Sequence, residues 1–213
     1  MMLAIKHRPK TFADVIGQDK VIAGLKWLLD RPSETGHAVL LTGPSGNGKT
    51  TLAECAARHW GCTELDIIRI ESAECDVNRV RDIADHMYTY GAGRDGHKAY
   101  IIDEVHTVNG RAADRLLSLL ESVPRHVLII GTTTETDWCS SMLFSRWFRL
   151  DLQKVSSAKV AEYLQGIAEA EGLPIPDDPK WAEKLVKYHG LNIRDQLNQL
   201  PARLLGGSLS VAA

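Results

Sequence analysis

The sequence has few cysteines, and they are widely spaced. They are Cys55, Cys62, Cys75 and Cys139, and no two of them form a C-x-x-C pair. This spacing argues against a disulfide framework or a zinc site and fits a reducing compartment. No apolar run approaches the ~20 residues that a membrane span requires, and the N-terminus shows no signal-peptide pattern. We therefore expect a cytoplasmic protein that does not contact a membrane.

The chain also has little excess of charge of either sign. Its 213 residues include 25 Lys and Arg against 27 Asp and Glu, which gives a formal net charge of −2. This balance neither indicates nor excludes a nucleic-acid partner, since a local basic face or a ring assembly can supply a field that the average hides. A hydrophobic fraction of 44% is ordinary for a globular protein. The length allows one large domain or one domain with a small appendage.

Residues 43–50 read G-P-S-G-N-G-K-T, which matches the G-x-x-x-x-G-K-T phosphate-binding loop. An apolar run at 38–41 precedes the loop and helix-forming residues follow it, as the motif requires. Glycines let backbone N–H groups turn toward an anion, and the following helix directs its positive end to the same place. We expect Lys49 to reach the outer phosphates and the Thr50 hydroxyl to bind Mg²⁺. An ordinary glycine-rich turn is the alternative.

Apolar runs alternate with helical patterns over the first two thirds of the chain. The expected strands cover residues 38–41, 65–70, 100–102 and 127–130, and the expected helices include residues 21–29, 76–90 and 113–120. This alternation predicts an α/β fold, a P-loop NTPase parallel sheet with helices on both faces. Ligands of such sheets gather at the carboxyl ends of the strands.

The last part of the chain has only helical patterns. We place a domain boundary near Lys154, with an α/β nucleotide-binding domain at residues 1–154 and a small three-helix lid domain at 155–213. Asn192 is the expected cap of the third helix. Pro201 is expected to kink that helix or to end it early.

Two carboxylates, Asp103 and Glu104, directly follow the expected strand at 100–102. Acidic pairs at strand ends are common surface features, but downstream of a phosphate loop they indicate catalysis. Asp103 is expected to hold Mg²⁺, directly or through water, and Glu104 to polarise the water that attacks the γ-phosphate.

Together these features resemble the AAA+ ATPases, and most closely the clamp-loader subunits of the bacterial gamma/tau and replication factor C small-subunit types. The resemblance runs from about Lys6 to Leu205. The matching segments are R-P-x-T-F-x-D-V-x-G-Q at 8–18, I-I-D-E-V-H at 101–106, G-T-T at 131–133, S-R-W at 145–147 and G-L-N-I-R-D at 190–195. The sequence departs from the family at Trp147, where a cysteine is usual, and it contains neither the gamma/tau zinc module nor the helical collar domain.

The resemblance implies roles for individual residues. Thr133 would contact the γ-phosphate or the attacking water, Arg146 would reach the neighbouring subunit's nucleotide, and Arg194 would lie over the phosphates. The implied catalytic residues are Lys49, Glu104, Thr133, Arg146 and Arg194, and the implied metal ligands are Thr50 and Asp103. The expected nucleotide-binding residues are Arg8, Pro9, Val15, Ile16, Gly43, Pro44, Ser45, Gly46, Asn47, Gly48, Lys49, Thr50, Thr51 and Arg194. The alternatives are a surface role for Arg146, a solvated Arg194 and an ordinary strand end at 132–134.

At the level of function, the resemblance implies a DNA-dependent ATPase that uses ATP and Mg²⁺ and works in DNA replication. Its implied partners are neighbouring AAA+ subunits, primed or branched DNA, and a sliding clamp. Asn78, Arg79 and Arg111 are the candidate DNA contacts, although solvated helix faces explain them equally well. Two alternatives are a recombination or replication-restart AAA+ ATPase that remodels branched DNA, and a non-hydrolysing ATP-dependent interaction module.

Overall fold

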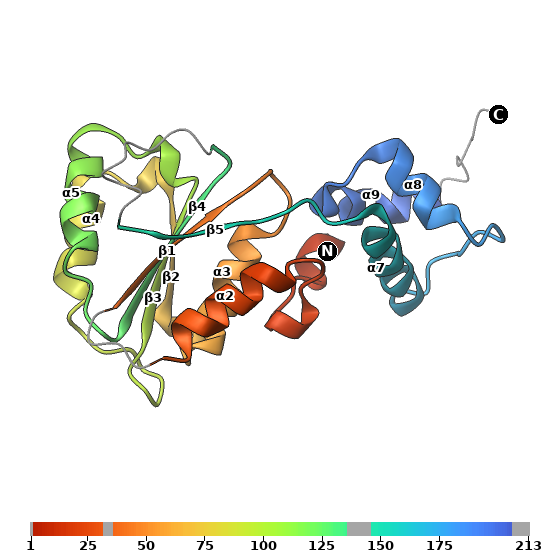
Figure 1. Cartoon of the computed structure of the whole chain (residues 1–213). Helices are drawn as coiled ribbons and strands as arrows, with labels where there is room; N and C mark the ends of the chain where they lie inside the picture. The colour runs from red at the N-terminus through yellow and green to blue at the C-terminus, as the bar shows by residue number, and fades with distance from the viewer. Residues whose placement is uncertain (1, 32–35, 136–145, 206–213) are drawn as a thin grey trace.

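A computed structural model of the chain describes residues 2–31, 36–135 and 146–205. Figure 1 shows an elongated molecule in which a sheet with its helices lies at one end and a group of helices at the other. The described residues contain no helix with both the length and the apolar character needed to cross a bilayer.

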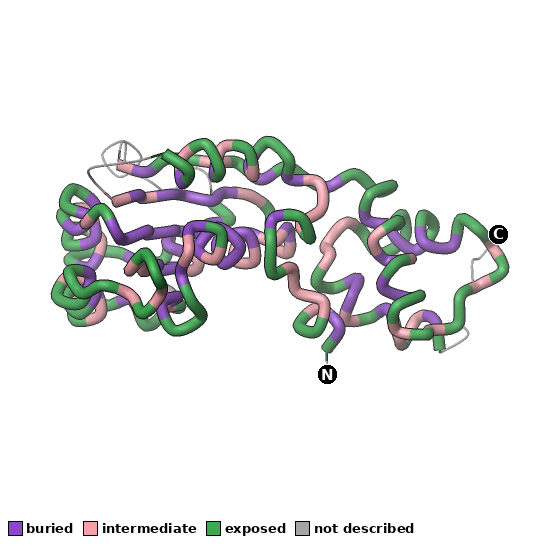
Figure 2. The backbone as a smooth tube through the Cα atoms, turned by 90° about the horizontal axis from the view of Figure 1, so that it is seen from below, coloured by how far each residue is buried: buried purple, intermediate pink, exposed green. Residues whose placement is uncertain are grey.

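The sheet is parallel throughout, as the alternation of strands and helices predicts. Its strands are β1 (His37–Thr42), β2 (Ile67–Glu71), β3 (Lys98–Asp103), β4 (Val127–Thr133) and β5 (Phe148–Asp151). They lie in the order β2-β3-β4-β1-β5. Every residue of β4 is buried, and Figure 2 shows buried strands along the interior of this part of the molecule. The register pairs Thr42 with Thr133 and Ile102 with Gly131, which brings the carboxyl ends of β1, β3 and β4 to one edge.

Helices cover both faces of the sheet. One face packs against α2 (Asp19–Leu29) and α3 (Lys49–His59), and the other against α4 (Val77–His86) and α5 (Gly110–Leu120). The two pairs lie on opposite sides of the sheet in Figure 1. Each pair contributes an apolar stripe to one of two clusters separated by the strands, as a sheet covered on both sides requires.

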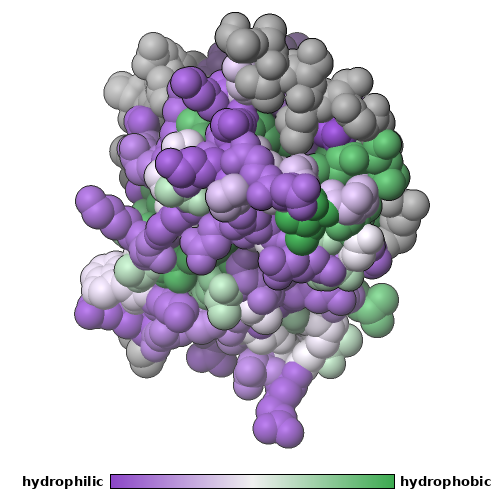
Figure 3. Space-filling model, turned by 90° about the vertical axis from the view of Figure 1, so that its right-hand side faces the viewer, coloured by the Kyte–Doolittle hydropathy of each residue, from purple (hydrophilic) through white to green (hydrophobic). Residues whose placement is uncertain are grey.

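The helical end of the molecule has its own hydrophobic cluster. It is formed by α7 (Ser157–Ala170), α8 (Trp181–His189) and α9 (Ile193–Leu205), and the short N-terminal helix α1 (Leu3–Lys6) adds Leu3 to it. Viewed from this end, the surface is mostly hydrophilic with smaller hydrophobic areas (Figure 3). The domain division at residue 154 stays a prediction.

One predicted helix is shorter in the structure, one strand was not predicted, and the helix that contains Pro201 does not end early. The helix expected at 76–90 ends at His86, where Met87 becomes the C-cap. Strand β5 was not expected, because it is a short edge strand whose residues are largely exposed. Pro201 does not end α9, which continues to Leu205. Leu200 and Leu204 are buried in the helical cluster, and their burial offsets the hydrogen bond that proline removes.

Candidate nucleotide-binding and catalytic site

The predicted phosphate loop joins the carboxyl end of β1 to the N-terminus of α3. Its glycines Gly46 and Gly48 have φ angles of 76° and 86°, in the left-handed region that other residues rarely adopt. A Cβ atom at Gly46 would lie 2.1 Å from Oδ1 of Asn192. Glycine at this position therefore lets α9, which Asn192 caps through the N–H of Asp195, approach the loop closely.

Lys49 begins α3, and its side chain is only 6% exposed. Its ammonium donates hydrogen bonds to the carbonyls of Gly43 (2.9 Å) and Pro44 (3.2 Å) and lies 4.0 Å from Oε1 of Glu104. Burial lowers the pKa of Lys49, and the carboxylates of Glu104 and Asp103 oppose that shift. The cation is thus held inside the loop with two acidic groups nearby.

The two predicted metal ligands, Thr50 and Asp103, are in direct contact. The hydroxyl of Thr50 donates to Oδ1 of Asp103 at 2.8 Å, and the hydroxyl of Thr132 donates to the same oxygen at 2.9 Å. Hydroxyl and carboxylate oxygens are ligands that Mg²⁺ prefers, so the donor set of Thr50 and Asp103 fits this ion. The contact from Thr132 was not anticipated, because a run of three threonines does not reveal which one faces Asp103.

Glu104 is the only non-glycine residue with a positive φ among the described residues (φ 50°). The left-handed conformation costs about 1–2 kcal/mol for such a residue. Its N–H donates to Oγ1 of Thr132 at 3.2 Å, which helps to hold this turn. Its Oε2 accepts hydrogen bonds from the backbone N–H (3.2 Å) and the hydroxyl (3.1 Å) of Thr134. His106 Nδ1 lies 3.3 Å from the same oxygen.

Thr133 lies at the same edge but makes different contacts. It is buried, and its Oγ1 lies 3.0 Å from Nδ1 of His106 and accepts the N–H of Glu135 at 3.0 Å. No hydrogen bond among the described residues joins it to Asp103. The structure therefore brings Thr132 to the acidic pair and Thr133 to His106, and the predicted contact of Thr133 with phosphate or water stays a prediction.

A cavity of about 330 Å³ lies between the phosphate loop, the N-terminal segment and α9. It brings together residues that are far apart in the sequence. Of the predicted nucleotide-binding residues, it is lined by Arg8, Pro9, Val15, Ile16, Gly46, Asn47, Gly48, Thr51 and Arg194. Gly43, Pro44, Ser45, Lys49 and Thr50 are not part of this lining but belong to the adjoining loop and helix.

Arg8 is held at the cavity by a network that the sequence did not reveal. Its Nη2 lies 3.1 Å from Oε1 of Glu54, and its Nε donates to Oγ1 of Thr51 at 3.3 Å. The side chain of Glu54 is only 2% exposed and also pairs with Arg58 and Arg69. Glu54 thus fixes one wall of the cavity from the middle of α3. The only sign of this network in the sequence was that Glu54, a carboxylate, falls on the buried side of its helix.

Comparison with known families supports the interpretation drawn from this geometry. The model of the ATPase family associated with various cellular activities (AAA) matches residues 39–154, which is more than half of the chain. The chain belongs to the AAA family. This confirms the predicted nucleotide-binding fold.

Two similar curated proteins are subunits of DNA polymerase III. DNA polymerase III subunit gamma of Buchnera aphidicola is 32% identical and aligns with 93% of this chain and 60% of its own length. The tau/gamma subunit of Haemophilus influenzae is 31% identical over 92% of this chain and 31% of its own length. The chain thus spans no more than about three fifths of these relatives.

Among solved structures, Thermotoga maritima RuvB, described as a Holliday junction branch migration motor, has a TM-score of 0.74. It is 26% identical and covers 91% of this chain, which in turn covers 64% of RuvB. The shared fold therefore extends beyond the region matched by the AAA model and includes the helical end.

The remaining predicted residues lie outside the cavity. Arg146 pairs with Glu121 at the end of α5, with Nε donating to Oε1 at 2.9 Å, while Ser145 falls outside the described residues. The candidate DNA contacts lie on α4 and α5, which pack on the same sheet face. Asn78 and Arg111 are exposed, and Arg79 is half-buried. They lie near the first turns of two helices that contact each other, and their role as DNA contacts stays a prediction.

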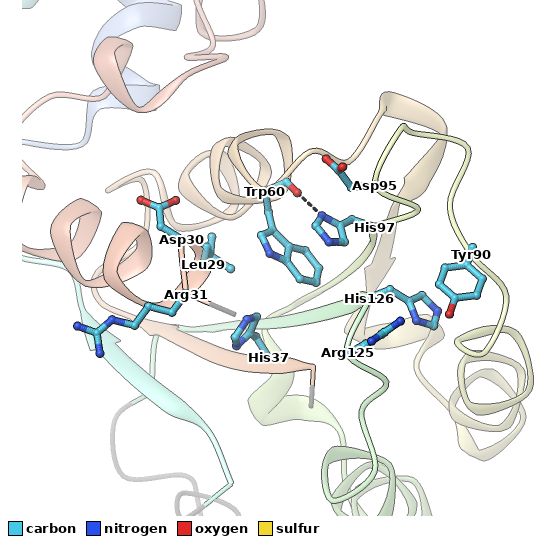
Figure 4. A pocket seen from close by; sticks show the side chains of 10 residues that line it. All are labelled: Leu29, Asp30, Arg31, His37, Trp60, Tyr90, Asp95, His97, Arg125 and His126. Atoms are coloured by element: carbon cyan, nitrogen blue, oxygen red, sulfur yellow. Dashed lines mark hydrogen bonds between the residues drawn. The ribbon is translucent and has the colours of Figure 1, made fainter. Parts of the chain in front are cut away.

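A second cavity, of about 430 Å³, lies near the amino ends of the strands, away from the acidic pair. Figure 4 shows that its lining combines Trp60, Tyr90 and three histidines with charged side chains. Trp60 stacks on His97 with ring centroids 3.9 Å apart, and Tyr90 stacks on His126 at 4.2 Å. This cavity lies at the amino ends of the strands, whereas the phosphate loop and the acidic pair lie at their carboxyl ends, so the two sites are separate.

Proposed function

We propose that the chain is an ATP-hydrolysing AAA subunit of clamp-loader type that acts on primed DNA in replication. The observation that carries this proposal is the convergence of Lys49, Thr50, Asp103 and Glu104 at one sheet edge, beside a cavity lined by residues of the N-terminal segment and α9. The gamma and tau/gamma relatives support the replication role.

Each of the residues gathered at the site has a task in this proposal. The loop amides and Lys49 bind the phosphates, and Thr50 and Asp103 hold Mg²⁺, whose charge offsets that of the phosphate oxygens. Glu104 polarises the attacking water as general base. Arg194, which lines the cavity from α9, contacts the phosphates.

We also propose that the active form is an oligomer with neighbouring AAA subunits. Arg146 does not line the cavity of its own chain and lies at the surface near α5. An arginine supplied by a neighbour stabilises transition-state charge in phosphoryl transfer, by about 10³-fold or more. In this arrangement, ATP binding and hydrolysis switch the assembly between states that grip and release DNA.

The test is steady-state ATP hydrolysis with and without primed DNA, for the wild type and Glu104→Gln. We expect DNA to stimulate turnover and Glu104→Gln to lower it by about 100-fold or more, because a positioned general base contributes at least that factor. Glu162→Gln, on an exposed part of α7, is the matched control and should retain activity. DNA-indifferent turnover in the wild type would contradict the proposal, and complete absence of phosphate release would favour a non-hydrolysing module.

A second candidate is a motor that remodels branched DNA, and the likeness to RuvB over 91% of the chain favours it. The two functions differ in their partner. An ATP-dependent complex with a sliding clamp, measured by pull-down, is expected only for the clamp-loader type. Unwinding or migration of a branched junction without a clamp would support the second candidate.

A further inference from the structure

Glu104 and Thr134 meet because each directly follows one of two neighbouring strands. Strands β3 and β4 pair in parallel, with Ile102 opposite Gly131, and both end at the carboxyl edge of the sheet. The residue that follows each strand therefore lies at that edge, next to its counterpart. Thr134 is the residue that this arrangement brings to the proposed catalytic carboxylate.

The two carboxylate oxygens of Glu104 have different surroundings. Oε2 accepts the backbone N–H of Thr134 at 3.2 Å and its hydroxyl at 3.1 Å, and Nδ1 of His106 lies 3.3 Å away. Oε1 is on the side of the phosphate loop, 4.0 Å from Nζ of Lys49, which is too far for a hydrogen bond. One oxygen is thus held by donors, and the other is turned toward the loop.

Packing alone does not fix the orientation of this carboxylate. The side chain of Glu104 is 41% exposed, and the last torsion of a glutamate has no sharp preferred angle. The donors at Oε2 therefore determine which oxygen faces the loop. Thr134 supplies two of them, and because one is a backbone N–H beside a buried strand, the contact has a rigid anchor.

We infer that Thr134 is a positioning residue for the proposed ATP hydrolysis, which holds Oε2 of Glu104 so that Oε1 faces the attacking water. In that step the water oxygen bonds to the γ-phosphorus, and the bond from this phosphorus to the bridging oxygen breaks. ADP leaves with the bonding electrons, and a proton of the water passes to Oε1. A base already held in position avoids the cost of ordering it during the reaction. The inference rests on the proposed role of Glu104 as general base and adds the residue that orients it.

The test is single-turnover ATP hydrolysis by the full chain with primed DNA present, combined with titration of a fluorescent ATP analogue. Thr134→Val removes the hydroxyl but keeps the shape of the side chain, and Thr134→Ser keeps the hydroxyl. Thr107→Val makes the same change at another exposed threonine, close to Glu104 in the sequence, and is the control. Glu104→Gln and the double variant Glu104→Gln with Thr134→Val complete a double-mutant cycle.

We expect Thr134→Val to hydrolyse ATP about tenfold more slowly than the wild type, the scale of one hydrogen bond to a charged group. Its affinity for the nucleotide analogue should stay within about twofold, because the contact orients the base and not the phosphates. Thr134→Ser and Thr107→Val should both hydrolyse ATP within about twofold of the wild-type rate. In the Glu104→Gln background, Thr134→Val should change the rate by about twofold or less, since Thr134 acts through the carboxylate that is already lost.

Hydrolysis by Thr134→Val at the wild-type rate or faster would overturn the inference and leave the proposed function standing. The same holds if Thr134→Val lowers the rate about tenfold further in the Glu104→Gln background, because a purely structural role would act independently of the carboxylate. If Glu104→Gln itself hydrolyses ATP at the wild-type rate, the proposed function and this inference both fail.

Discussion

Replacing Thr132 with valine should slow ATP hydrolysis without preventing ATP binding. Valine keeps the shape of threonine but lacks its hydroxyl, which donates to Asp103 at 2.9 Å and accepts the N–H of Glu104 at 3.2 Å. A hydrogen bond to a carboxylate contributes about 1.5–3 kcal/mol, and a buried N–H left unpaired costs about 1–3 kcal/mol. We expect about 2 kcal/mol of this loss to appear in the transition state, which corresponds to a fall in turnover of about 30-fold.

The assay is single-turnover hydrolysis of ATP, combined with titration of a fluorescent nucleotide. Thr132→Val should bind nucleotide within about threefold of the wild type, since its hydroxyl serves the acidic pair rather than the loop. Thr133→Val is the matched control, because that hydroxyl contacts His106 instead of Asp103. Turnover of Thr132→Val within about twofold of the wild type would refute the reasoning. A large loss in Thr133→Val alone would instead support the role that the sequence motif assigns to Thr133.

Two further predictions concern stability and reactivity. Burial raises the pKa of Asp66, but hydrogen bonds from Thr63 and from the backbone N–H groups of Ala92 and Gly93 outweigh it, and its folded pKa lies below the ordinary 3.8. Asp66→Asn should therefore lower the free energy of unfolding by about 2 kcal/mol at pH 7. In urea titrations, the difference in unfolding free energy between the wild type and Asp66→Asn should shrink as the pH falls below about 4. A difference that does not change with pH would contradict this prediction. Burial raises the pKa of Cys55 to about 11 and of Cys62 to about 12. Iodoacetamide at about pH 8 should therefore leave both thiols unlabelled in the native protein and label them in urea. Peptide mass spectrometry measures the labelling. Rapid labelling of the native protein would contradict this prediction, because it would show that the two thiols are accessible.

Much of the nucleotide site could be predicted from the sequence because its signals are local. The glycines around Lys49 impose a turn whatever the rest of the chain does, and a buried strand that runs into Asp103 and Glu104 places both carboxylates at the carboxyl edge of a parallel sheet. The N-terminal residues Arg8 and Pro9 were expected at the nucleotide through the family resemblance, and the cavity includes both.

What could not be predicted depends on register and on long-range packing. Adjacent threonines 132 and 133 point to different partners because side chains alternate along a strand, and only the strand register decides which of them meets Asp103. The left-handed turn at Glu104 is supported by contacts from Thr132, on a different strand. Pro201 is tolerated because leucines on its own helix are buried by other helices, and no local propensity contains that information.

The packing of Leu3 with the last three helices means that the N-terminal segment joins the two ends of the molecule, as the segment before α7 also does. Phe12 and Leu152 pack with the sheet, whereas Leu3 and Val155 pack with the helices, so one crossing begins between Leu3 and Phe12 and the other lies between Leu152 and Val155. Two covalent crossings resist twisting in a way that a single linker does not. Arg8 lies within the first crossing and lines the cavity, so any change in the relative position of the two ends would also change the shape of the cavity.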